Sequence, residues 1–267
     1  RYGSSNPSGR RLEVWRAIDR IPVFAQAGGI VPLQELGDGD AVNDLDNPQS
    51  LRVLVFPGAN GRFAMIEDDG VFVPSAQSAQ IGEADIHTAT TRMSFNWRDA
   101  GRTDADGDGS SLFTVAPVEG KTDAVPSQRD WTMVFRGVAD VNPVDIGVDI
   151  DDTPCDGVET SYDARTLSLS VTVRQVPSSA GLNVAIRGGL HIADNPVEHD
   201  AFNVLMHAQM PYGSKEHAMR AIYEQGVRAI GALRTFKTAP SFGDGLFAAN
   251  GMPDAVIGAL TEILLRD

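Results

Sequence analysis

The sequence predicts a mainly β protein of antiparallel β-sandwich domains, followed by a C-terminal α-helical extension. Two observations predict this class. Up to about residue 190, short runs such as 51–55 and 167–173 alternate apolar and polar residues, which is the pattern of half-buried strands separated by turns. After Asn195 the apolar spacing changes to that of helices. The sequence therefore predicts C-terminal helices whose apolar faces pack against one another, against a sandwich face or against a missing part of the protein.

The expected strands are bounded by turn sequences. Residues 12–15 alternate and are expected to form a strand, as are residues 51–55. Asn60-Gly61 lies between two apolar runs, which predicts a hairpin. Gly28-Gly29 permits a close backbone approach or a positive φ. The aspartates of the turn 67–70 are expected to bond nearby backbone amides.

Three signals mark the helices. Asn195 followed by Pro196 is a typical helix start, Ser214 is expected to cap a second helix, and Pro253 is expected to open a last one. Between the second and third signals, apolar residues and one glycine share a predicted helical face: Met219, Ile222, Tyr223, Gly226, Ile230 and Leu233.

Composition limits the classes of partner. The chain has 267 residues and a formal net charge of −14, which disfavours nucleic acid and anionic membrane surfaces. A single cysteine, Cys155, allows no internal disulfide and fits a reducing, cytoplasmic location. The first residue is Arg1 and not Met, so we expect the true N-terminus to be absent.

Several blocks together resemble one family. The segments 20–33, 51–58 and 61–70 closely resemble the β-domain that follows the catalytic barrel in glycoside hydrolase family 31, the α-glucosidases and α-xylosidases. Segments 87–97, 113–120, 129–138 and 162–173 are similar to the distal β-domain of that family, and the tail, with Gln209, Lys215 and Glu262, is similar to a helical extension of some bacterial members. The resemblance implies three parts: residues 1–74 as the remainder of the proximal domain, 75–194 as the distal β-sandwich and 195–267 as a helical tail.

The resemblance also implies a function. Family members retain configuration by using two aspartates on a (β/α)8 barrel, and this sequence shows neither the barrel pattern nor those motifs. The chain is therefore expected to be the noncatalytic C-terminal part of an α-glucosidase or α-xylosidase, inactive by itself and without a cofactor. Its expected partners are the missing barrel, the α-linked oligosaccharide substrate of the whole enzyme and, in a homo-oligomer, further copies.

Carboxylates that suggest catalysis have structural explanations. Trp97-Arg98-Asp99 looks like part of a catalytic motif but ends an expected distal strand. Glu67, Asp68 and Asp69 are adjacent, as in many turns that cap backbone amides. We therefore assign no catalytic residue, no cofactor-binding residue and no metal ligand.

Metal and nucleophile candidates are also weak. The loop 104–109 fits the opening of a calcium-binding EF-hand loop, but Val115 stands where a bidentate Glu is required. The histidines show no metal-site spacing: His87, His191, His199, His207 and His217. Cys155 lies beside several aspartates, which disfavour its thiolate.

Two other classes of function remain open. A carbohydrate-binding module would stack a sugar on Trp15, Trp97 or Trp131, and glucan pull-down by the chain would favour it. A protein-interaction scaffold would show stable dimers without sugar affinity. Large aromatic residues are more often part of the core.

Overall fold

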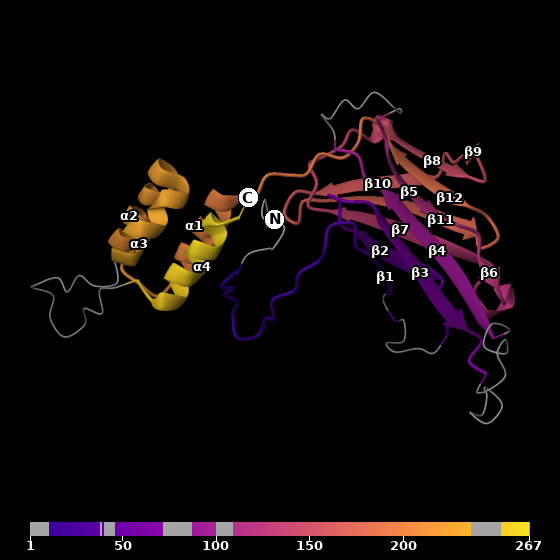
Figure 1. The fold of residues 1–267 in the computed structure, drawn as a ribbon, viewed down its shortest axis with the longest axis horizontal. Coiled ribbons are helices and arrows are strands. Elements are labelled where there is room, and N and C mark those ends of the chain that lie inside the picture. Colours follow the sequence, from indigo (N-terminus) through magenta and orange to yellow (C-terminus); the bar gives the residue numbers. More distant parts are fainter. Residues whose placement is uncertain are drawn as a thin grey trace, which may run out of the picture. The chain divides into compact units, whose positions relative to one another are not determined.

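The computed structural model describes residues 11–37, 39, 46–71, 87–99, 109–235 and 252–266. The chain forms two compact units (Figure 1). The β-unit comprises Ala25–Ala193, and the helical unit combines Arg1–Phe24 with Asp194–Asp267. The fold class expected from the sequence, mainly β with a helical extension, is confirmed.

The described strands of the β-unit form two sheets. Sheet A has, in spatial order, β1 (Ile30–Gln34), β2 (Ser50–Val55), β7 (Gln128–Arg136), β11 (Ser168–Pro177) and β10 (Val158–Asp163). Sheet B has β3 (Gly61–Asp68), β4 (Thr88–Asn96), β5 (Ser111–Val115), β12 (Leu182–Ile186), β8 (Ile146–Ile150) and β9 (Thr153–Pro154), with β6 (Glu119–Gly120) paired to β4. Neighbouring strands are antiparallel except β2 and β7, which are parallel. Two 3₁₀ turns, Thr122–Ala124 and Pro143–Asp145, lie in the connections.

The two sheets enclose a single apolar core. Period-2 alternation directs Val53 and Val55 of β2 and Val171 and Val173 of β11 into it, as the sequence pattern predicts. Phe135 of sheet A lies with its ring centroid 5.8 Å from that of Phe95 and 6.4 Å from that of Phe113, both in sheet B. The Phe95 pair is tilted at 48° and the Phe113 pair is edge-to-face at 87°, and both contacts link the two sheets.

The hairpin predicted at Asn60-Gly61 is wrong. β2 belongs to sheet A and β3 to sheet B, so the turn carries the chain from one sheet to the other. The reason is a close backbone approach by Gly28, which has φ +82° and on which a Cβ would lie 2.4 Å from the Asn60 carbonyl oxygen. Gly28 N–H also donates to the Phe56 carbonyl at 2.7 Å. The role expected for Gly28 is confirmed.

A buried ion pair joins the two sheets. Arg129 of β7 donates through both terminal nitrogens to Glu67 of β3, at 2.8 and 2.6 Å. The two side chains are 1% and 6% exposed. Burying a charge without a partner costs a large amount of free energy. The burial of Arg129 therefore requires Glu67, and the burial of Glu67 requires Arg129.

Strands on both sides of the expected domain boundary share both sheets. β1, β2 and β3 precede residue 74, and all other strands follow it. The boundary itself, between residues 74 and 75, lies outside the described residues. The separate proximal and distal domains therefore stay a prediction, while Ala25–Ala193 form one compact unit in this structure.

The helical unit contains α1 (Val197–His207), α2 (Tyr212–Gln225), α3 (Ala229–Thr235) and α4 (Asp254–Leu264). Its core includes Ile222, which is 2% exposed, and Leu233, which is fully buried. The expected single stripe is broken by Gly226, whose φ of +54° ends α2 before the 3₁₀ turn Gly226–Arg228. The second helix begins at Tyr212 after Pro211, so Ser214 lies inside its first turn and is not the expected cap.

The segment predicted as a strand at residues 12–15 has no regular structure and instead packs on α4. Trp15 N–H donates to the Glu262 carboxylate at 2.8 Å, and Arg16 Nη1 donates to both oxygens of the same carboxylate at 2.8 and 2.9 Å. The Trp15 indole lies against Gly258, where a Cβ would be 2.1 Å from the ring. The backbone N–H of Trp15 therefore finds its hydrogen-bond acceptor on a helix and not in a sheet.

No helix of the described part of the chain has the length and apolar character needed to cross a bilayer.

The buried ion pair generates a first prediction. Arg129→Met leaves the Glu67 carboxylate buried without its partner, so we expect the free energy of unfolding of the β-unit to fall by about 3–5 kcal/mol. Removing both charges in Glu67→Leu/Arg129→Met should cost less. Urea unfolding followed by far-UV circular dichroism measures this. Arg174→Met, which breaks the exposed Arg174–Glu159 pair, is the control and should have a much smaller effect; equal losses in the two single variants would contradict the prediction.

A second prediction concerns Gly258. Gly→Ala in a helix interior normally stabilises by about 1 kcal/mol, but at Gly258 the new methyl group would collide with Trp15, so we expect lower thermal stability and a changed Trp15 fluorescence. Gly231→Ala in α3 is the matched control, because a Cβ there would meet nothing within 4 Å, and it should stabilise. The contact is refuted if both substitutions stabilise the helical unit equally.

Candidate functional site

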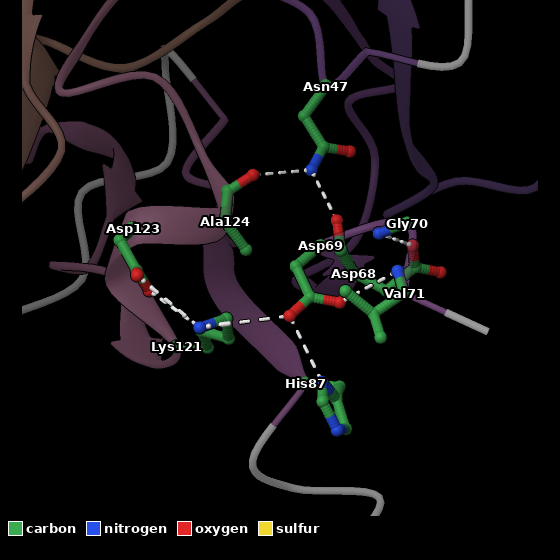
Figure 2. A network of polar contacts seen from close by, with 9 residues as sticks. All are labelled: Asn47, Asp68, Asp69, Gly70, Val71, His87, Lys121, Asp123 and Ala124. Atoms are coloured by element: carbon green, nitrogen blue, oxygen red, sulfur yellow. Dashed lines mark hydrogen bonds and ion pairs between the residues drawn. The ribbon is translucent and has the colours of Figure 1, made fainter. Parts of the chain in front are cut away.

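The acidic turn, residues 67–70 at the end of β3, carries three successive carboxylates, and Figure 2 shows the polar network around Asp68 and Asp69. The first of its carboxylates, Glu67, points inward to Arg129. The next, Asp68, accepts from the Gly70 N–H at 2.8 Å, and Asp69 accepts from the Val71 N–H at 3.0 Å. The expected bonding of the aspartates to their own turn is therefore confirmed.

Asp69 is also held by two basic side chains. Its Oδ2 lies 3.0 Å from His87 Nδ1 and 3.7 Å from Lys121 Nζ. The hydrogen bond from His87 is the main cause, and the Val71 N–H a second, of a pKa of Asp69 below its ordinary value. These hydrogen bonds stabilise the ionised form of the Asp69 carboxyl group.

Asn47 links this turn to the connection between β6 and β7. Its Nδ2 donates to the carbonyl oxygens of Asp68 at 2.8 Å and Ala124 at 2.7 Å (Figure 2). Lys121, which lies just before Ala124, donates to Asp123 at 3.3 Å. The network therefore ties together the segment before β2, the end of β3 and the connection between β6 and β7.

This arrangement lacks the parts of a glycosidase centre. A retaining glycosidase needs one carboxyl group with a raised pKa and a second, ionised one across a sugar pocket. Here Asp69 has a lowered pKa, Glu67 is committed to a buried arginine, and Asp68 caps its own turn. The contacts of these carboxylates close the backbone of the turn and form an ion pair between the sheets.

The other candidates from the sequence lie apart from the turn. Asp99 lies 3.8 Å from His191 in an exposed pair, and its backbone bridges Leu190. Cys155 is half-buried against the sandwich core. Among the described residues, no group of three or more His, Cys, Asp and Glu side chains could hold a metal ion.

The aromatic and calcium candidates have different outcomes. Trp131 is 4% exposed in the sandwich core and Trp97 packs against that core, so neither is available for stacking on a sugar, whereas Trp15 is 38% exposed. In the loop that fits the opening of an EF-hand, residues 104–108 lie outside the described residues, and the absence of tight calcium binding there stays a prediction. Val115, at the position of the missing ligand, is buried in β5.

Sequence reasoning missed the partners of the turn. Arg129 is 62 residues from Glu67, and Asn47 is 77 residues from Ala124. A local sequence pattern carries no information about contacts between residues so far apart in the sequence. The only available hint was that a carboxylate at the inward position of β3 needs a buried cation.

Asp69 generates a prediction for pH. Since its folded-state pKa is lowered, the stability it contributes is complete above its ordinary pKa and is lost as pH falls through the folded value. His87→Ala removes the largest cause of the shift, so the pKa of Asp69 should rise toward its ordinary value in a carboxyl NMR titration. His217→Ala, an exposed change on α2, should leave it unchanged. The same Asp69 pKa in wild type and His87→Ala would show that His87 does not hold the carboxylate.

Comparisons with known proteins were made at three levels. No family model matches the chain. In sequence, the chain is 34% identical over 70 residues to an α-xylosidase of Saccharolobus solfataricus, a match that covers 26% of this chain and 9% of that protein.

Solved structures give partial matches. A GH31 dextranase of Flavobacterium johnsoniae matches with 14% identity and a TM-score of 0.43, covering 62% of this chain and 20% of that one. A GH31 α-xylosidase from Xanthomonas citri matches with 21% identity and a TM-score of 0.36, covering 67% and 15%. The chain spans a fifth or less of the length of each of these relatives. The resemblance drawn from the sequence is confirmed: this chain is similar, over part of its length, to an α-glycosidase.

Proposed function

We propose that the chain is the noncatalytic C-terminal part of a retaining α-glycosidase of the α-glucosidase or α-xylosidase type. In this proposal it supports a catalytic (β/α)8 barrel that acts on α-linked oligosaccharides in the cytoplasm. The observation that carries the proposal is the 34% identity to an α-xylosidase over a segment that covers only 9% of that enzyme. The described strands also form two mainly antiparallel sheets, unlike the alternating parallel strands and helices of a (β/α)8 barrel.

The chemistry of the described carboxylates supports a noncatalytic role. The two carboxyl groups of a retaining glycosidase stand about 5–5.5 Å apart with a sugar between them. In the acidic turn, Glu67 and Asp69 are instead bonded to Arg129 and His87, and Asp68 to the backbone of the turn. No carboxyl group of this turn is left in a position to protonate a leaving group.

The edges of the two sheets support a docking role. β1 and β3 are the edge strands at one end of sheets A and B. Both carry exposed large apolar side chains, Val31 and Leu33 on β1 and Phe63 and Ile66 on β3, with Ile66 69% exposed. Exposed apolar edge strands are hazards that proteins normally cover. In the proposed enzyme, the barrel or its neighbouring domain covers them.

The proposal predicts that the 267-residue chain hydrolyses neither aryl α-glucosides nor aryl α-xylosides. It has no assembled acid and nucleophile among its described carboxylates, so a released-sugar assay should give the background rate. The longer protein encoded by the same reading frame upstream of Arg1 is the positive control and should contain a barrel and turn over one of these substrates.

Two outcomes would overturn the proposal. One is turnover by the 267-residue chain that survives repurification and disappears on substituting Asp68, Asp69 or Asp99. The other is an upstream coding sequence that encodes no barrel with paired aspartates.

A further inference from the structure

Side chains of α1 and α2, the first two helices of the helical unit, line an apolar hollow; Figure 1 shows the two helices. Its volume is ≈ 400 Å³, and its walls include Phe202 and Met206 from α1 and Tyr212, Met219 and Tyr223 from α2. Four of these side chains are exposed: Phe202 by 49%, Met206 by 52%, Tyr212 by 77% and Tyr223 by 61%. Aromatic and methionine side chains gathered in this way are typical of the centre of a protein interface.

The charges around the hollow cancel. Its lining includes two cations, Lys215 and Arg220, and two anions, Glu216 and Glu224. The whole chain carries a net charge of −14, so most of its surface would repel a second copy at long range. This hollow is a place where two copies can meet without adding like charges.

The order of charges along α2 favours one pairing. Glu216 and Arg220 form an i,i+4 pair at 3.1 Å, and both side chains are 57% exposed. Residues four apart lie on the same side of a helix. When two such helices pack antiparallel about a two-fold axis that passes near residue 218, each Glu216 lies opposite the Arg220 of the other helix. A parallel arrangement would instead place Glu216 opposite Glu216.

We propose that this face of the helical unit binds a second copy of the chain, with α2 packed antiparallel against α2 across a two-fold axis. The contact is isologous: both copies use the same surface, so the interface covers the hollow of each copy. Tyr223, Met219 and Phe202 supply most of the affinity as buried anchors. The ring of two glutamates and two arginines selects the direction of packing, because exposed ion pairs add specificity more than affinity. This inference does not depend on the proposed glycosidase.

Sedimentation velocity of the 267-residue chain tests the surface. We expect a dimer at micromolar concentrations and a loss of dimer in Tyr223→Glu. Val227→Glu is the matched control: Val227 is 54% exposed in the same unit but does not line the hollow, and its substitution adds the same charge and should leave the dimer intact. Circular dichroism of both variants checks that they fold.

A mixing experiment tests the pairing itself. Glu216→Arg and Arg220→Glu each place like charges opposite one another, so each should weaken its own dimer roughly tenfold. An equimolar mixture of the two variants restores opposite charges and should form a heterodimer at about the wild-type affinity. Intramolecular effects cannot produce this rescue.

The proposal is overturned by a wild-type chain that stays monomeric at its highest soluble concentration. It is also overturned by equal loss of dimer in Tyr223→Glu and Val227→Glu, or by a mixture of the charge variants that associates no better than either alone. Those results would indicate that another part of the chain or a different protein covers the hollow.

Discussion

The β-unit depends on one requirement, that the charge of Glu67 and the charge of Arg129 be buried together. Both side chains are almost completely enclosed, and the bidentate geometry satisfies both oxygens of the carboxylate. A hydrophobic pair of similar size could be as stable, but it would not require one particular strand of sheet A to face one particular strand of sheet B. The pair therefore specifies which strands meet, while the phenylalanines around Phe135 supply the apolar burial.

The same ion pair accounts for how the neighbouring acidic residues are placed. Glu67 faces the interior because β3 alternates, so Asp68, which ends β3, faces outward, and Asp69 begins the turn that follows. The Gly70 N–H donates to Asp68, and the Val71 N–H and His87 bond the carboxylate of Asp69. A run of three carboxylates that looks reactive in the sequence is thus divided between a structural ion pair and a turn closure.

Local features of this fold could be predicted from the sequence, and features that depend on distant residues could not. β2 and β11 follow from period-2 alternation, and the aspartate turn follows from bonds to amides two residues away. The hairpin at Asn60-Gly61 was wrong because the close approach of Gly28 sends the chain to the other sheet. The strand at residues 12–15 was wrong because the partner of Trp15 is 247 residues away. For the same reason, no local pattern could predict the basic partners of Asp69 or the arginine that pairs with Glu67.

The contact of Arg16 with Glu262 has a consequence for biosynthesis. The two residues are 246 positions apart, so the segment that carries Trp15 and Arg16 leaves the ribosome long before α4 exists. At roughly 5–20 residues per second, this segment waits on the order of ten to fifty seconds for its partner. The β-unit, whose described strands all lie between these two residues, can assemble during that interval. Until α4 is synthesised, the Trp15 segment precedes a folded sandwich in the chain without the helix on which it packs.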